Sequence, residues 1–374
     1  MSPDRVALPL EVVSAGETDR GIRRSSNEDS LLVRSDLGLY VVADGAGGHS
    51  AGNVASAIAT SAVAKWFDGS EAEYRDKPEM DAFGLWTAAR RLSIAVQNAN
   101  TAVIDIARTS NRYRGMGTTI VCALLSPETG RLHIAHVGDS RCYRLRDGTL
   151  ELLTHDHSIL NDVMELYADL DDQALGRLPR KVITRALGLD ERVRVALRTY
   201  RALVGDRYLL CSDGLTGELG ESVLETLVGV SAPIPDVVRD LVRAAKEAGG
   251  RDNITALVVD CKQGTASSTR QSPPRFTTTA RFGGSQPEII ASELSGSAAE
   301  IVFFNPPGKD DKAEPHISVV PVNSVDAQTI RALDKVAGAL QNEERKCVRC
   351  SALMSGALAC PRCGYTESEP LSRS

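Results

Sequence analysis

Two kinds of hydrophobic pattern alternate along the first 262 residues. Short apolar runs that stop at turn residues, such as residues 39–43 (LYVVA), are typical of buried strands. Apolar residues spaced three or four apart predict amphipathic helices, and the clearest begins at Ala51, behind Ser50 as N-cap, and continues to Trp66. Because hairpins and helices mix without regular strand–helix alternation, the pattern predicts an α+β domain built on antiparallel sheet.

The remaining elements of this region follow from the same two patterns. Turn signals at Gly130 and at the pair Asp147-Gly148 mark two hairpins, and Gly249 marks the end of a helix. Strands are expected at 118–125, 132–137, 142–145, 150–153, 208–211 and 254–259, and helices at about 81–108 and 236–248.

Beyond residue 262 the periodic pattern stops. Residues 263–325 are rich in Ser, Thr, Pro and Gly, which predicts a disordered linker that carries candidate phosphorylation sites. A modest helix is expected over 326–342, followed by a cysteine-rich segment at 343–366 and a tail at 367–374. We therefore expect one large domain, 1–262, joined by the linker to a small C-terminal module.

Composition narrows the classes of protein to which the chain can belong. The net charge is −6 and aromatic residues make up only 4%, so an electrostatic or base-stacking nucleic-acid surface is not expected. No apolar run approaches the roughly 20 residues that span a bilayer, and the first residues lack the pattern of a signal peptide. These features predict a soluble, cytoplasmic protein without a membrane partner.

The eight cysteines fall into two sets. Four are scattered in apolar stretches and are expected to be small buried hydrophobic residues: Cys122, Cys142, Cys211 and Cys261. The other four form two CxxC pairs and resemble a zinc ribbon: Cys347, Cys350, Cys360 and Cys363. Four thiolates would close the shell of one structural Zn²⁺, and the module would dock another protein. Redox-active or disulfide-linked cysteines are the alternative.

Four aspartates lie in turns at the edges of candidate strands. They are Asp44, Asp139, Asp213 and Asp252, and two of them are followed directly by glycine. Carboxylates at strand ends can converge on one side of a sheet, and such oxygen ligands suit Mg²⁺ or Mn²⁺. Any one Asp-Gly pair alone is more often an ordinary turn, so spacing by itself leaves a shared metal centre open.

Seven sequence blocks that include these turns resemble the metal-dependent protein phosphatases (protein phosphatase 2C, or PPM, family). The resemblance is to the compact bacterial serine/threonine phosphatases that oppose eukaryotic-like kinases, and it implies a four-layer αββα sandwich of two antiparallel sheets flanked by helices. In family order the blocks are RSSNEDS (24–30), VADGAGGH (42–49), GMGTT (115–119), VGDSR (137–141), TRALG (184–188), LCSDG (210–214) and GRDNIT (250–255).

The resemblance also implies a set of metal ligands. Asp44 would bridge two Mn²⁺ or Mg²⁺ ions at the catalytic centre, and Gly45 would bind one of them through its backbone carbonyl. Asp213 and Asp252 would bind the other ion. Asp139 matches the residue that helps to form a weaker third site in bacterial members.

Three further positions match family residues with roles around the ions. Glu28 and Asp29 would hold metal-bound waters, and Arg24 would bind the substrate phosphate through its planar, permanently charged guanidinium. Ala46 departs from the family, since animal and plant relatives often have a histidine there. A metal-bound water is then the expected proton donor, and nearby His49 is expected to support its loop.

These assignments predict a protein-serine/threonine phosphatase that uses a metal-activated water. Phosphorylated proteins, including Ser/Thr kinases and their substrates, are the expected partners. A catalytically weak, phosphatase-like regulatory binding module and a zinc-ribbon nucleic-acid-binding regulator are the alternatives. The intact aspartates disfavour the first and the acidic balance disfavours the second. An acidic stretch at 166–172, within the variable flap at 158–181, leaves substrate specificity open.

Overall fold

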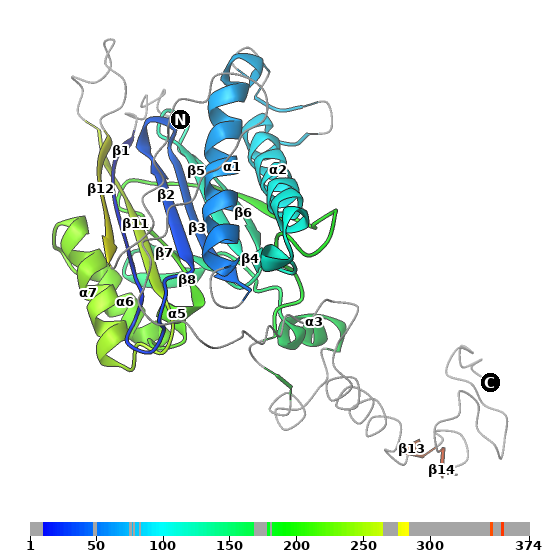
Figure 1. Cartoon of the computed structure of the whole chain (residues 1–374). Helices are drawn as coiled ribbons and strands as arrows, with labels where there is room; N and C mark the ends of the chain where they lie inside the picture. Colours follow the sequence, from blue (N-terminus) through cyan, green and yellow to red (C-terminus); the bar gives the residue numbers. More distant parts are fainter. Residues whose placement is uncertain are drawn as a thin grey trace, which may run out of the picture. The chain divides into compact units, whose positions relative to one another are not determined.

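The computed structural model describes residues 10–47, 51–74, 77, 79–81, 84–167, 178–179 and 182–264. It also describes the backbone of three later strands, 276–283, 345–346 and 353–354. The chain divides into two compact units, of which the first takes in residues 1–168 and 178–319 and the second takes in 169–177 and 320–374. The described residues up to 283 all belong to the first unit (Figure 1).

Two sheets form the centre of the first unit. The first sheet has the order β12-β1-β11-β10-β7-β8, and the second has the order β2-β3-β5-β6-β9 with the short β4 paired to β3. The strands of the first sheet are β1 (Leu10–Asp19), β7 (Arg141–Arg146), β8 (Thr149–Leu152), β10 (Arg207–Cys211), β11 (Ile254–Gln263) and β12 (Phe276–Gly283). Those of the second are β2 (Asp29–Arg34), β3 (Leu39–Ala46), β4 (Gly117–Thr118), β5 (Ile120–Ser126), β6 (Arg131–Val137) and β9 (Ala196–Arg201).

Helices cover the outer face of each sheet (Figure 1). Long helices α1 (Ala51–Tyr74) and α2 (Thr87–Thr109) share a buried cluster with the second sheet, whereas α6 (Glu221–Gly229) and α7 (Ile234–Glu247) share one with the first. A third cluster joins the two sheets, so the layers run helix, sheet, sheet, helix. Two short helices, α3 (Ile159–Leu166) and α5 (Asp213–Thr216), lie in the connections.

The four-layer arrangement explains the continuous apolar runs in the sequence. Successive residues of a strand point to opposite faces of the sheet, and here both faces are covered. In β3, Leu39 and Val41 pack toward α1 and α2, whereas Tyr40 and Val42 pack against the first sheet. The prediction of an α+β fold with two helix-flanked antiparallel sheets is thereby confirmed, with one parallel pair, β1 with β12.

The boundaries of α2 differ from the sequence prediction. We expected a helix from about residue 81, but α2 begins at Thr87. Asp81 explains the difference, because its carboxylate accepts the backbone N–H of Leu85 at 2.9 Å and its carbonyl accepts that of Gly84 at 3.0 Å. An aspartate that bonds nearby backbone groups stabilises a turn in competition with a helix. The sequence pattern also gave no sign of β1, β2 or β9.

One strand lies inside the range predicted as linker. Strand β12 pairs in parallel with β1, with Thr277 opposite Val13 and Thr279 opposite Ala15. Its three consecutive threonines are β-branched and favour extended backbone. The prediction of disorder throughout 263–325 is therefore wrong for 276–283, and the rest of that range lies outside the described residues, apart from the end of β11 and Gly264.

In the second unit the structure describes only two short strands. Strands β13 (Arg345–Lys346) and β14 (Leu353–Met354) pair antiparallel, with Arg345 opposite Met354. The predicted helix at 326–342, the four ribbon cysteines and the tail lie outside the described residues. Among the helices that the structure does describe, none is long and apolar enough to cross a membrane.

Candidate metal centre

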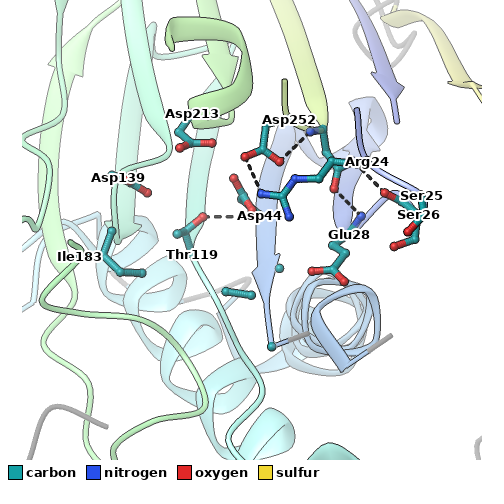
Figure 2. A pocket seen from close by; sticks show the side chains of 14 residues that line it. Arg24, Ser25, Ser26, Glu28, Asp44, Thr119, Asp139, Ile183, Asp213 and Asp252 are labelled. Carbon is teal, nitrogen blue, oxygen red and sulfur yellow. Dashed lines mark hydrogen bonds and ion pairs between the residues drawn. The ribbon is translucent and has the colours of Figure 1, made fainter. Parts of the chain in front are cut away.

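A cavity of about 650 Å³ opens where the ends of both sheets meet (Figure 2). Five carboxylates and a single guanidinium line it, so its charge is strongly negative when the carboxyl groups are ionised. The lining residues are Arg24, Ser25, Ser26, Glu28, Asp44, Gly45, Ala46, Gly47, Thr119, Asp139, Ile183, Asp213, Asp252 and Asn253.

Elements of both sheets bring the predicted aspartates to this cavity. Asp44 lies near the end of β3, directly opposite Asp29 at the start of β2. Asp139 occupies the turn between β6 and β7, and Asp213 begins α5 just after β10. Asp252 lies shortly before β11. Residues more than 200 positions apart in sequence thus converge, as the sequence blocks predicted, and only Asp29 lies behind the cavity wall.

The backbone around Gly45 packs so closely that no side chain fits. The N–H of Gly45 donates to the carbonyl of Glu28 at 3.1 Å, and a Cβ on Gly45 would lie 2.0 Å from the carbonyl oxygen of Gly52. A Cβ on Gly52 would in turn lie 2.3 Å from Oε2 of Glu28 and 2.8 Å from the carbonyl oxygen of Gly45. Two oxygen donors, one carboxylate and one carbonyl, therefore lie together against the first turn of α1.

Asp29 is a buried carboxylate that hydroxyl groups support. Its Oδ2 accepts hydrogen bonds from Ser212 and Thr255, each at 2.7 Å, whereas its Oδ1 has no partner among the described residues. Burial, helped by the charges of Asp213 and Asp252, raises the pKa of Asp29 to about 7 despite these two bonds. A buried carboxylate oxygen without a donor suits a bound water or cation.

Burial and mutual repulsion both disfavour the charged form of the carboxyl groups in and behind the cavity. Burial raises the pKa of Asp44 well above its usual value, and the charges of Asp29, Asp213 and Asp139 raise it further. Burial likewise raises the pKa of Asp139 to about 7, with Asp213 as the leading charged contributor. Carboxylates gathered at such a cost are those that a divalent cation stabilises, because the cation neutralises their mutual repulsion.

Arg24 reaches into the cavity from the loop between β1 and β2. Its Nη2 donates to Oδ2 of Asp252 at 2.8 Å, and about half of its side chain is exposed. The guanidinium therefore lies beside a predicted metal ligand, at the mouth of the cavity (Figure 2). This position agrees with a residue that meets a substrate phosphate close to the aspartates.

Asn253 has a structural role that the sequence analysis missed. Its Nδ2 donates to the carbonyls of Arg20 and Ser26, at 2.9 and 2.8 Å, and its Oδ1 accepts the N–H of Glu28 at 2.8 Å. One buried amide thus uses three hydrogen bonds to hold the loop that carries Arg24 beside Asp252. The polar residue directly after Asp252 was the available signal, but its partners are more than 220 positions away in sequence.

Thr119 is a second residue whose role emerged only from the structure. Its Oγ1 accepts the N–H of Asp44 at 3.2 Å and lies 2.7 Å from Oγ of Ser140. Its own N–H donates to the carbonyl of Asp44 at 2.8 Å. Thr119 therefore links the strand end that carries Asp44 to the turn that carries Asp139.

The donor set fits a hard divalent cation. Every charged donor in the cavity is a carboxylate, and oxygen ligands of this kind are those that Mg²⁺ and Mn²⁺ prefer. Within the described ranges no three His, Cys, Asp or Glu side chains are drawn together closely enough to enclose an ion by themselves. One of the carboxylates, Asp252, is paired with Arg24 at 2.8 Å.

The cysteines of the large unit take no part in the cavity. Cys122, Cys142, Cys211 and Cys261 are buried free thiols, as predicted, and burial raises the pKa of each. Ala46 lines the cavity without a group that could transfer a proton. His49, the predicted loop residue, and residues 168–172 of the acidic stretch lie outside the described residues.

Comparison with known sequences agrees with this geometry. Residues 20–259 match the family model for protein phosphatase 2C. The chain is 36% identical over 260 residues to the serine/threonine protein phosphatase PstP of Mycobacterium tuberculosis, covering 68% of this chain and 46% of PstP, about half its length. It is 32% identical over 246 residues to the serine/threonine phosphatase stp of Listeria welshimeri, covering 65% of this chain and 93% of the other.

Solved structures give the same result. The Mycobacterium tuberculosis phosphatase PstP/Ppp superposes with a TM-score of 0.58 at 32% identity, covering 68% of this chain and all of that one. The catalytic domain of PstP in complex with two manganese ions gives a TM-score of 0.57 at 32% identity, covering 68% of this chain and 99% of that domain. Sequence blocks, fold and the carboxylate cavity thus agree, and the chain belongs to the protein phosphatase 2C family.

Proposed function

We propose that this chain is a metal-dependent protein phosphatase that hydrolyses phosphoserine and phosphothreonine esters. The observation that carries the proposal is the cavity itself, in which five carboxylates and the guanidinium of Arg24 face one another. Carboxylates can hold the cations that neutralise a phosphoryl group, and arginine can bind its oxygens. Among the described lining residues there is no cysteine or histidine, so neither a thiolate nor an imidazole nucleophile is present among them.

The proposed ligands are the residues expected from the sequence blocks. Asp44 would bridge two Mn²⁺ or Mg²⁺ ions, with the carbonyl of Gly45 on one ion and Asp213 and Asp252 on the other. Asp139 would serve a weaker third site. Bound ions would supply an activated water and neutralise phosphoryl charge. Support comes from the oxygen-only donor set and from the two manganese ions in the related PstP catalytic domain.

The remaining residues of the site would orient groups without binding the ions directly. Glu28 and Asp29 would accept hydrogen bonds from metal-bound waters, and the free Oδ1 of Asp29 is available for this. Arg24 would exchange its bond with Asp252 for phosphate oxygens of the substrate, which it can bind in a bidentate manner. The methyl side chain of Ala46 cannot protonate the leaving alkoxide, so a metal-bound water would do so.

Dephosphorylation of a phosphothreonine peptide, with and without Mn²⁺, tests this proposal. We expect turnover that depends on Mn²⁺ and is lost in Asp213→Asn, which removes the charge of one ligand while keeping its volume. Peptide binding without turnover would instead support a phosphatase-like binding module. Neither binding nor turnover with any phosphorylated peptide or aryl phosphate would overturn the proposal.

Phosphorylated proteins of the cytoplasm are the proposed substrates, including serine/threonine kinases and the proteins that such kinases modify. The mycobacterial and listerial relatives are named as serine/threonine phosphatases, which supports this class of substrate. Phosphoproteome comparison of cells with and without the gene tests it. The proposal predicts that phosphoserine and phosphothreonine sites rise together, with no change at phosphotyrosine.

We also propose that the C-terminal cysteines form a structural zinc ribbon that docks another protein. The pairing of β13 with β14 supports it, because the first CxxC pair, Cys347 and Cys350, lies between these strands in sequence. Two thiolates in a tight turn between paired strands are a common half of a zinc site. Measurement of one zinc per chain, lost in Cys347→Ser while Mn²⁺-dependent turnover persists, would support the assignment. Loss of turnover in that variant would contradict a separate module.

A further inference from the structure

The turn that carries Asp139 is held by a histidine outside the set of proposed ligands. The backbone N–H of Gly138 donates to Nδ1 of His157 at 3.1 Å, and the backbone N–H of His157 donates to the carbonyl of Gly138 at 3.0 Å. Two hydrogen bonds thus fix the residue directly before Asp139. Both bonds are shielded from water, because only 4% of His157 is exposed.

The turn needs such support because of its backbone conformation. Gly138 has φ of +101°, and a Cβ there would lie 2.6 Å from the Cβ of Thr119. Only glycine tolerates this combination of positive φ and close packing, and glycine is also the residue with the most conformational freedom to lose. The direction in which Asp139 leaves the turn therefore depends on bonds from outside it.

His157 also bonds, through its backbone carbonyl, to a second segment next to the cavity. Its carbonyl accepts the N–H of Thr184 at 2.8 Å, and the neighbouring Ser158 forms a β-bridge with Ile183. Ile183 lines the cavity together with Asp139 (Figure 2). One residue therefore joins the turn of Asp139 to the segment of the cavity wall that carries Ile183.

The geometry also defines which ring nitrogen of His157 carries a proton. A backbone N–H can only donate, so the Nδ1 that accepts the bond from Gly138 must have a free lone pair, and the proton lies on Nε2. The ring stacks on His136 with centroids 4.8 Å apart and an angle of 12° between the planes. His136 is fixed in turn, because its Nε2 donates to the carbonyl of His155 at 2.8 Å.

We propose that His157 is a positioning residue for phosphoester hydrolysis: through Nδ1 it holds the Gly138–Asp139 turn, and through its backbone it holds the cavity wall at Ile183. It does not touch the substrate, and it acts through Asp139. This inference rests on the proposed phosphatase function. A residue that only filled space in the core would affect stability without any specific effect on turnover.

Two variants separate the acceptor from the bulk of the side chain. His157→Asn places an amide oxygen where Nδ1 lies, so it can still accept from Gly138. His157→Leu keeps apolar bulk but removes the acceptor. We expect kcat/KM per folded molecule to fall about tenfold to a hundredfold in His157→Leu, the range for a catalytic group displaced by about 1 Å. We expect His157→Asn to stay within about threefold of the wild type, because the acceptor is kept.

His133→Leu is the matched control. His133 is also a buried histidine, and its Nδ1 lies 2.9 Å from the hydroxyl of Thr199 in the pairing of β6 with β9, outside the cavity lining. The His133→Leu variant should lower the free energy of unfolding without lowering kcat/KM of the folded protein. Equal losses of kcat/KM in His133→Leu and His157→Leu would overturn the proposal.

A double-mutant cycle tests whether His157 acts through Asp139. In an Asp139→Asn background, His157→Leu should reduce kcat/KM little further, whereas two independent effects would multiply. Nitrogen NMR of histidine-labelled, full-length wild type gives a readout without turnover, and it should show His157 with its proton on Nε2. A proton on Nδ1, or multiplying losses, would overturn the proposal. An inactive wild type would instead overturn the proposed function.

Discussion

The clearest prediction concerns Asn253, the amide that holds the loop carrying Arg24. In Asn253→Asp the side chain keeps its size and its acceptor for Glu28. The second carboxylate oxygen, however, takes the place of Nδ2, which donates to the carbonyls of Arg20 and Ser26 at 2.9 and 2.8 Å. Two hydrogen bonds become two contacts between oxygens that both carry negative charge. Because Asn253 is only 4% exposed, water cannot easily replace the lost donor.

The magnitude follows from the number of bonds lost. Each buried acceptor left unsatisfied costs about 1–3 kcal/mol, so the two carbonyls together should cost roughly 2–6 kcal/mol. If the loop moves away to relieve this cost, the fraction of molecules with Arg24 in place falls at least about thirtyfold, since 1.4 kcal/mol is a factor of ten. The expected result is a comparable loss of kcat/KM for a phosphothreonine peptide.

Asn100→Asp is a matched control for this prediction. Asn100 is a buried amide on α2 that donates to the carbonyls of Asp190 and Glu191 at 2.8 and 3.4 Å and accepts from Gly188 at 2.8 Å. The same chemical change there should lower the free energy of unfolding by a similar amount without affecting the Arg24 loop. Steady-state kinetics at saturating Mn²⁺, corrected for the folded fraction, measure the difference. An unchanged kcat/KM in Asn253→Asp, or an equal loss in both variants, would refute the reasoning.

Three further predictions follow from the same cavity. Arg24→Ala should raise KM for a phosphopeptide with a smaller effect on kcat, because the phosphate is charged before and during attack; a KM equal to that of the wild type at saturating Mn²⁺ would contradict this. Asp213→Asn should lower turnover by several orders of magnitude because a metal ligand loses its charge, and it should raise the melting temperature of the metal-free protein because one repelling charge is gone. Retention of a tenth of the activity would exclude Asp213 as a ligand. Asp29 and Asp139, whose pKa values are raised to about 7, keep protons in the native state that the unfolded chain releases near pH 4, so the stability of the metal-free protein should fall as pH rises from about 4 through 7. Thermal melting in EDTA should show this fall and Mn²⁺ should reduce it, whereas a rise in stability over this range would contradict the prediction.

Where a local pattern was enough, the sequence predicted the structure well. The apolar run at 39–43 is buried on both faces of a sheet, and the spacing after Ala51 is the buried face of α1. Turn residues at strand ends mark the cavity, because a chain that leaves a buried strand must expose polar groups there. The predicted residues Arg24, Glu28, Asp44, Asp139, Asp213 and Asp252 all line it.

What the sequence could not determine are bonds between distant segments. Strands β1 and β11 pair although they lie about 240 positions apart, Asn253 binds the loop before β2, and His157 binds the turn before Asp139. The spacing of hydrophobic residues along a segment indicates which of its faces is buried, but it does not indicate which other segment packs against that face. A hydrogen bond depends on direction and on distances of about 3 Å. Only the packing of the two sheets brings these groups within that range, so only the tertiary structure decided how the site is held.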